Sequence, residues 1–225
     1  MGLALFDLDN TLLGGDSDYL WGRFLVENGI VDADHYEQEN HRFYQQYQAG
    51  NLDIQAFLAF SLRPLAEHPP ERLHQWRETF IRELIAPIML PAARDLLARH
   101  RSQGDTLVII TATNRFITAP IAERFGVEHL LATEVEQVDG RYTGHSYDIP
   151  CFQDGKVRRL EQWLATHDTD LSQSWFYSDS HNDLPLLERV THPCGRSGRH
   201  PAPHRLARGW PVISRAGVRV PPVSR

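Results

Sequence analysis

The sequence predicts an α/β fold, a doubly wound, Rossmann-like parallel sheet with a helical unit inserted after the first strand. Three short apolar runs, at residues 3–9, 105–113 and 174–183, each end in polar side chains. Buried parallel strands have this pattern where their carboxyl ends open on a site. Segments with helical spacing of apolar residues separate the runs, and the long stretch after the first run shows no strand pattern.

The first run, "LALFDLDNT", places Asp7 and Asp9 two residues apart at the end of a strand. A regular strand would point both carboxylates to the same face. Two carboxylates this close raise each other's pKa unless a cation or a proton lies between them. The alternative is a surface turn, because Asp-Asn-Thr is also common turn chemistry.

Four helical segments follow between about residues 16 and 88, punctuated by Gly29, Gly50 and the pair Pro69-Pro70. This region is too long for an ordinary loop between a strand and a helix, so we interpret it as a lid or cap. The predicted domains are a core formed by 1–15 and 89–215, a helical cap at 16–88 and a loosely ordered tail at 216–225.

The second run, "DTLVIITAT", contains Thr111 at the predicted end of its strand, where the hydroxyl is placed to hold a phosphate oxygen together with backbone N–H groups near the start of the following helix. Farther along, "VEQVDGRYTG" carries an Asp-Gly pair between two alternating stretches and predicts a β-hairpin. The segment "GKVRRLEQWLATH" predicts a helix that opens after Gly155.

The third run, "SWFYSDSHND", is followed by Asp179, Asn182 and Asp183. Oxygen ligands at neighbouring strand ends favour a hard cation such as Mg²⁺ over zinc. Each polar group has an alternative role as a helix cap, but all three runs place such groups at the carboxyl end of a predicted strand. The sequence therefore predicts one site at this edge of the sheet.

Lys156 is the single lysine among 23 basic side chains. A site that gathers several carboxylates and a phosphoryl group needs a compact positive charge on a flexible stem. A guanidinium would require a wide slot for its planar fork. The alternative is a surface lysine without a role.

Composition and charge exclude several classes of protein. The first apolar stretch is too short for a signal peptide or a membrane span, so we expect a soluble, cytoplasmic protein. Cys151 and Cys194 have no metal or redox spacing and are expected to be free thiols. The net charge is −6, yet eight arginines and no acidic residue follow Glu188. This basic tail lacks aromatic interleaving and any groove-reading motif, so nucleic-acid binding is the weaker alternative.

The pieces "FDLDNT", "IITAT", "GK" and "SDSHND", in this order, resemble the haloacid dehalogenase superfamily over about residues 3–190. The helical insert resembles its type I cap and the phosphoserine-phosphatase-like and histidinol-phosphatase-like branch. The resemblance implies a Mg²⁺-dependent phosphomonoesterase that forms an aspartyl-phosphate. It implies that Asp7 is the nucleophile and Asp9 the general acid and base. It implies that the phosphate is bound by Thr111, Ala112 and Lys156. The metal ligands that it implies are Asp7, Asp9 and Asp179, with Asn182 and Asp183 supporting the metal site.

A phosphotransferase or mutase shares these motifs and stays open as an alternative.

In phosphoserine phosphatases an acidic residue at the spacing of Asp16 binds the substrate amine, although Asp16 could equally be a helix cap. Alignment with their insert puts Ser61 where they carry an arginine for the substrate carboxylate, and Arg63 lies two residues away. We therefore expect a phosphorylated amine without a carboxylate, best matched by histidinol phosphate, with phosphoserine as the alternative. Candidates to contact its ring are Tyr19, Trp21, Tyr44 and Tyr47.

The expected partner is thus a small phosphorylated metabolite, with no nucleic acid and no membrane, and the expected state is a monomer or homodimer.

Overall fold

A computed structural model of the 225-residue chain describes residues 2–196, 212–214 and 217–218. It confirms the predicted doubly wound α/β fold. The sheet has the strand order β4-β3-β2-β1-β5-β6-β7-β8, with parallel pairing from β3 to β7 and antiparallel pairing at both ends. The strands are β1 (Leu3–Phe6), β2 (Thr106–Asn114), β3 (His129–Val138), β4 (Arg141–Tyr147), β5 (Ser174–Ser178), β6 (His192–Arg196), β7 (Val212–Ser214) and β8 (Gly217–Val218).

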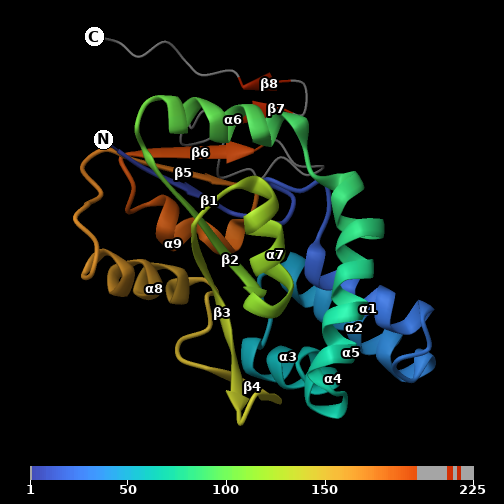
Figure 1. Cartoon of the computed structure of the whole chain (residues 1–225). Coiled ribbons are helices and arrows are strands. Elements are labelled where there is room, and N and C mark those ends of the chain that lie inside the picture. The colour runs from blue at the N-terminus through green and yellow to red at the C-terminus, as the bar shows by residue number, and fades with distance from the viewer. Residues whose placement is uncertain (1, 197–211, 215–216, 219–225) are drawn as a thin grey trace.

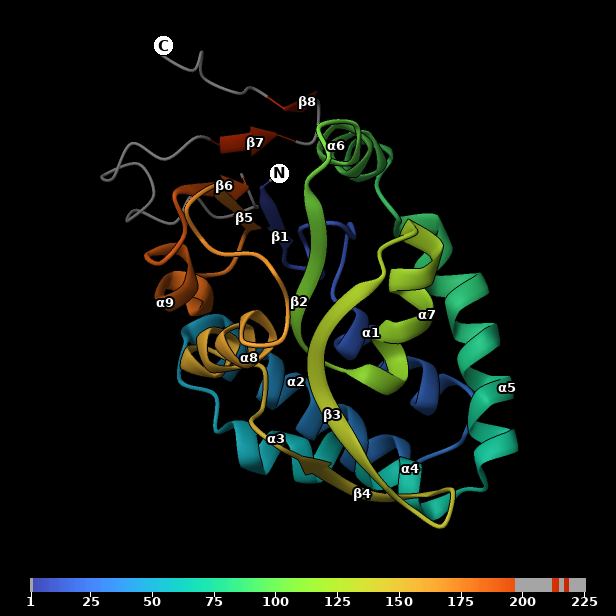
Figure 2. The same ribbon diagram turned by 60° about the vertical axis from the view of Figure 1, so that its left-hand side comes forward.

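Helices cover both faces of this sheet (Figures 1 and 2), with α6 and α7 on one face and α8 and α9 on the other. The central strands alternate between two hydrophobic clusters. Ala4 and Phe6 belong to one cluster, and Leu3 and Leu5 belong to the other. This period of two is what burial on both faces requires. The core helices are α6 (Pro91–Ser102), α7 (Arg115–Phe125), α8 (Asp154–Leu164), the short η3 (His181–Asp183) and α9 (Leu184–Leu187).

The predicted insert is helical throughout and lies beside the core as a separate group of helices (Figure 1). Its third predicted segment is divided into two helices at Leu62, one residue before Arg63-Pro64. Proline lacks an N–H and is tolerated best in the first turn of a helix, and Pro64 lies in the first turn of the second of these helices. The cap contains α1 (Ser17–Glu27), α2 (Ala33–Ala49), α3 (Ile54–Ser61), α4 (Arg63–Glu67), α5 (Pro70–Phe80), a π-helical turn η1 (Ile81–Ile85) and a 3-10 turn η2 (Ala86–Ile88).

Two adjacent linkers connect the cap to the core. The chain leaves the core near Leu13 and returns near Met89, and these two residues form an antiparallel bridge. The Gly14 N–H donates to the Ile88 carbonyl at 2.7 Å, and the Leu90 N–H donates to the Leu12 carbonyl at 3.2 Å. The helical insert is therefore joined to the core through one paired stem.

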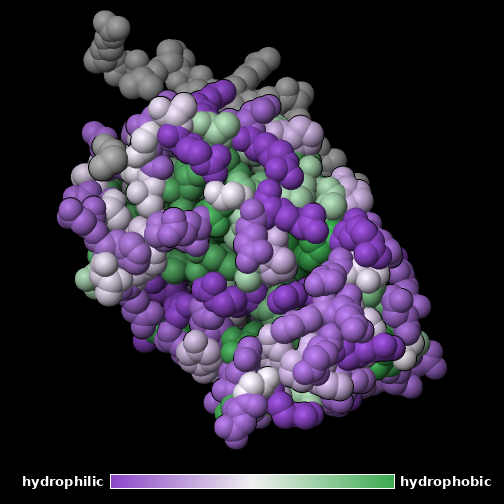
Figure 3. Space-filling view, in the orientation of Figure 1, coloured by the Kyte–Doolittle hydropathy of each residue, from purple (hydrophilic) through white to green (hydrophobic). Residues whose placement is uncertain are grey.

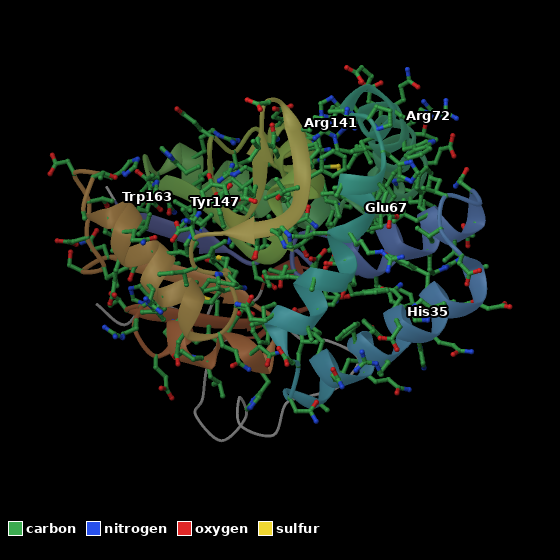
Figure 4. The ribbon with its side chains drawn as sticks, turned by 90° about the horizontal axis from the view of Figure 1, so that it is seen from below. His35, Glu67, Arg72, Arg141, Tyr147 and Trp163 are labelled. Atoms are coloured by element: carbon green, nitrogen blue, oxygen red, sulfur yellow. The ribbon has the colours of Figure 1, made fainter. Side chains whose placement is uncertain are left out.

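The hairpin of β3 and β4 is confirmed, with a turn at Asp139 and Gly140. Both residues have positive φ angles, 50° and 76°, as a tight two-residue hairpin turn requires. The hairpin packs on cap helices α3 and α4, and Figure 4 shows it, with Arg141 and Tyr147, beside the helix that carries Glu67. A Cβ on Gly144 would lie 3.1 Å from the Ala66 Cβ, so strand and helix pack closely here.

The surface seen in Figure 3 is largely hydrophilic over the cap, and hydrophobic side chains gather over the middle of the core. No helix among the described residues is long and apolar enough to cross a membrane. The predicted tail at 216–225 lies outside the described residues, apart from Gly217–Val218, which form β8.

Candidate active site

A cavity lies between the carboxyl ends of the central strands and the cap. Asp7, Asp9, Thr111 and Ala112 line it from the core, and Asp16 lines it where the cap begins. The structure thus brings together predicted residues that are as much as 105 positions apart in the sequence. The remaining lining residues are Asp18, Tyr19, Asn40, Phe43, Tyr44, Tyr47, Leu52, Ile54, Phe57, Thr113 and Phe152.

Asp7 and Asp9 reach the cavity because the backbone stays extended just beyond β1. The Asp7 N–H still donates to the Tyr177 carbonyl at 2.9 Å, which continues the sheet pairing by one residue. Leu8 is fully buried, whereas both carboxylates line the cavity. The chain then turns through Asn10, whose φ of 55° is in the left-handed region that asparagine tolerates. The expected placement of the two carboxylates on one face is what the structure shows.

Asp9 is held in place through both oxygens. Its Oδ1 accepts from the Ser17 N–H at 2.6 Å, and its Oδ2 accepts from the Thr113 hydroxyl at 2.8 Å. Burial raises the pKa of Asp9, although the hydrogen bonds from Ser17 and Thr113 oppose the shift. Thr113 was missed from the sequence, yet it lies two residues after Thr111 on the same strand, a spacing that places both side chains on one face.

Lys156 lies in a fully protein-lined position, with only 3% of its side chain exposed. Its Nζ donates to Asp7 Oδ1 at 2.8 Å and to Asp183 Oδ2 at 2.9 Å. Burial alone would lower the pKa of Lys156, but the charges of Asp183 and Asp7 outweigh it and the pKa is raised. Lys156 is therefore buried beside Asp7 and is not a surface lysine, although it is not itself one of the residues that line the cavity.

The local backbone explains how the lysine reaches this position. Gln153, just before α8, has φ 49° and ψ −121°, and it turns the chain inward. A Cβ on Gly155 would lie 1.9 Å from the Pro150 carbonyl oxygen, so only glycine fits there. Helix α8 begins at Asp154, one residue before the predicted glycine.

The predicted residues after β5 lie at the same edge of the sheet. Asp183 accepts from the Ser178 hydroxyl at 2.6 Å as well as from Lys156. The Asp179 N–H donates to Thr11 Oγ1 at 3.1 Å, which ties this loop to the turn after β1. Asn182 donates to the Tyr47 carbonyl of the cap at 3.2 Å. The loop after β5 thus contacts the lysine, the first loop and the cap.

The site carries more negative charge than Lys156 balances. Burial raises the pKa of Asp7 well above its usual range. Lys156 opposes this shift, whereas Asp183 and Asp179 add to it. Within the described part of the chain, no three acidic, histidine or cysteine side chains converge closely enough to hold a metal ion by themselves. A cation here would need a backbone oxygen in addition to carboxylates.

Asp16 is a helix cap, as one of the two expectations had it, and its binding of a substrate amine stays a prediction. It caps α1, where its Oδ1 accepts from the N–H groups of Asp18 and Tyr19 at 3.1 and 2.9 Å, and it also lines the cavity. Burial and the charge of Asp9 raise the pKa of Asp16 to about 7.

The other cap candidates are divided between the cavity and its surroundings. Tyr19, Tyr44 and Tyr47 line the cavity, whereas Trp21 packs in the cap core against Phe24 and Phe80. Arg63 and Ser61 do not line the cavity. The Arg63 side chain is 69% exposed and pairs with Glu67 at 3.0 Å, and Ser61 is buried.

This fold and this site place the molecule in a defined class. The chain belongs to the haloacid dehalogenase-like hydrolases, whose sequence model matches residues 4–188. Within that family it is an enzyme of the phosphatase type.

Known proteins agree with this assignment. The chain is 42% identical, over 217 residues, to the histidinol-phosphatase of Neisseria meningitidis serogroup C, with 94% of this chain and 98% of that protein covered. A crystal structure of a protein of unknown function from Bordetella pertussis Tohama I is 45% identical, with a TM-score of 0.87 over 95% of this chain and 98% of that one. A phosphoserine phosphatase captured as a phospho-aspartyl intermediate analogue shares the fold at 16% identity, with a TM-score of 0.69 over 95% and 93% of the two chains.

Proposed function

We propose that this enzyme is a Mg²⁺-dependent phosphomonoesterase that acts on a small phosphorylated metabolite through an aspartyl-phosphate. The observation that supports this most directly is that Asp7 and Asp9 line the same cavity, while the buried Lys156 lies behind this lining and contacts Asp7 at 2.8 Å. The Asp7 carboxylate is thus oriented by the Lys156 ammonium group, whereas neutral donors hold the Asp9 carboxylate. Two carboxylates in different environments can take different roles in catalysis.

Asp7 is the proposed nucleophile. Its free oxygen attacks phosphorus in line, and the ester oxygen leaves as the aspartyl-phosphate forms. Thr111 and the backbone N–H of Ala112 border the same cavity and are placed to hold the phosphoryl oxygens, and Lys156 offsets their negative charge.

Asp9 is the proposed general acid and base. A raised pKa favours the protonated form that can donate to the leaving oxygen. The resulting carboxylate then takes a proton from the water that splits the aspartyl-phosphate. The Thr113 hydroxyl can donate or accept, so it can follow Asp9 through both protonation states.

The donor set fits Mg²⁺. Asp7 and Asp179 supply carboxylates, the Asp9 carbonyl supplies a backbone oxygen, and the uncompensated charge around Asp7 favours a divalent cation. Asn182 and Asp183 support the loop that carries Asp179. Bound Mg²⁺ would neutralise charge on the phosphoryl oxygens.

Chelation tests the cofactor. We expect EDTA to remove nearly all hydrolysis of p-nitrophenyl phosphate and added Mg²⁺ to restore it, because a site with several carboxylates and one lysine repels a phosphate dianion. Initial rates before and after Mg²⁺ is added back check this. Full hydrolysis in excess EDTA, after dialysis against chelator, would contradict the proposal.

The substrate we propose is histidinol phosphate. Four carboxylates line the cavity, from Asp7, Asp9, Asp16 and Asp18, and no lysine, arginine or histidine is among the described residues that line it. The cap end of such a cavity suits a cation and disfavours a carboxylate. Tyr19, Tyr44 and Tyr47 provide an aromatic wall for a ring. The relative that is 42% identical is a histidinol-phosphatase.

Side-by-side kinetics with histidinol phosphate and phosphoserine test this substrate. We expect kcat/KM to favour histidinol phosphate by about ten- to hundredfold, because the carboxylate of phosphoserine would be desolvated without a cationic partner. A clear preference for phosphoserine would contradict the substrate and favour the phosphoserine phosphatase alternative. Transfer of the phosphoryl group to added amino alcohols, followed by product analysis, would identify a phosphotransferase.

A further inference from the structure

Asp18 lines the substrate cavity, and the proposed mechanism gives it no role. Among the described residues, no hydrogen-bond donor or cation contacts its carboxylate, whose charged neighbours are Asp16 and Asp9. Burial, with these two carboxylates, raises its pKa well above the usual range. An acidic side chain held in this way is costly unless a positive charge enters the cavity.

Helix stability alone does not explain this placement. Asp18 is the second residue of α1, where an acidic side chain favours the helix dipole. Asp34 occupies the equivalent position of α2, two residues after the capping aspartate Asp32, and its side chain is exposed to solvent. The dipole therefore requires no burial, and Asp18 differs from Asp34 in lining the cavity.

The carboxylates are arranged along the cavity from core to cap. Asp16 is the N-cap of α1, where the cap begins, and it lines the cavity together with Asp9 of the core. Asp18 lies in the first turn of α1, inside the cap, and lines the same cavity. Asp16 thus lies nearer the core end of the site, and Asp18 lies farther into the cap.

The surroundings of the cap end suit a planar cationic group. Phe43, Tyr44 and Phe57 line the cavity there together with the amide of Asn40. Aromatic faces attract cations and stack on planar rings, and a carboxylate beside them can accept a hydrogen bond from a ring N–H. An ammonium group bound at Asp16 would need neither these aromatic rings nor a second carboxylate.

We propose that Asp18 is a specificity-determining residue that binds a second basic nitrogen of the substrate, beyond the amine bound at Asp16. This inference rests on the proposed function and extends it: the preferred substrate class is a phosphate monoester with two basic nitrogens, the farther one in a planar ring. Asp16 binds the amine on the carbon next to the phosphate-bearing carbon, and Asp18 binds the basic nitrogen of the ring.

The test compares histidinol phosphate with 2-aminoethyl phosphate, which has the amine but no ring. In the Asp18→Asn variant we expect the ratio of kcat/KM for the two substrates to fall by about ten- to hundredfold, chiefly through a higher KM for histidinol phosphate. Asp34→Asn, at the equivalent helix position, is the matched control and should keep the wild-type ratio. Thermal unfolding establishes that both variants are folded.

The outcomes separate this inference from the function on which it rests. An unchanged ratio in folded Asp18→Asn, or an equal loss on both substrates, overturns the role of Asp18 and leaves the phosphatase proposal standing. A wild-type preference for phosphoserine over histidinol phosphate overturns the proposed substrate and the inference together, and it is measured without any variant.

Discussion

Asp7→Asn is expected to remove essentially all hydrolysis while leaving the fold intact. The amide keeps the shape of the side chain, but it cannot attack phosphorus. Loss of a covalent nucleophile costs about three orders of magnitude or more in kcat. The measurement is kcat for p-nitrophenyl phosphate, with Asp95→Asn as the control, because Asp95 is an exposed aspartate on α6.

The fold should survive because Lys156 keeps a second partner. Asp183 accepts a hydrogen bond from the Lys156 Nζ at 2.9 Å, and this bond does not depend on the Asp7 carboxylate. Burial raises the pKa of Asp7, so the folded protein holds the Asp7 proton more tightly than the unfolded chain does. At any pH above the usual aspartate pKa range, Asp7 therefore lowers the free energy of unfolding of the metal-free protein. A neutral amide removes that cost, and we expect the Tm at pH 7 without Mg²⁺ to be unchanged or higher. Near-normal turnover by the folded variant would contradict the mechanism.

Local sequence patterns predicted most of the fold because its elements obey short-range rules. Strands β1, β2 and β5 are apolar runs buried on both faces, and the hairpin turn needs residues that tolerate positive φ, which Asp139 and Gly140 are. The break at Leu62 in the third cap segment was missed, although Pro64 is a local signal for it.

The candidate site was predictable on the core side and much less so on the cap side. Asp7 and Asp179 follow β1 and β5, and Thr111 lies within β2 toward its carboxyl end; these three strands are neighbours in the sheet, so the meeting of the three residues follows from the topology. Which cap residues reach the cavity depends on how the helices pack on one another. Asn40 and Phe152 carry no local signal for it, and Trp21 was a wrong candidate because its ring is needed in the cap core.

Lys156→Arg should lose most of its activity, unlike an ordinary exchange of these residues on a surface. Its ammonium group lies between Asp7 and Asp183, 2.8 Å from an oxygen of each, and is 5.8 Å from the centre of the Phe176 ring. A guanidinium is wider and brings five donors in a rigid plane, and the Lys156 position is enclosed, with only 3% of the side chain exposed. Insertion of extra atoms into a packed interior costs about 1–3 kcal/mol.

The composition of the chain makes this comparison sharper. Apart from Lys156, all Lys or Arg positions in the chain are arginine. One of them is Arg158, which lies two residues after Lys156 and is exposed. We expect Lys156→Arg to reduce kcat/KM by about a hundredfold or more, since the charge that offsets the phosphoryl oxygens is displaced. Arg158→Lys is the matched control, two residues farther along the same helix on its exposed face, and should retain wild-type kinetics. If Lys156→Arg kept most of the wild-type kcat/KM, a point charge at this position would not be required, and the solitary lysine would be an accident of composition.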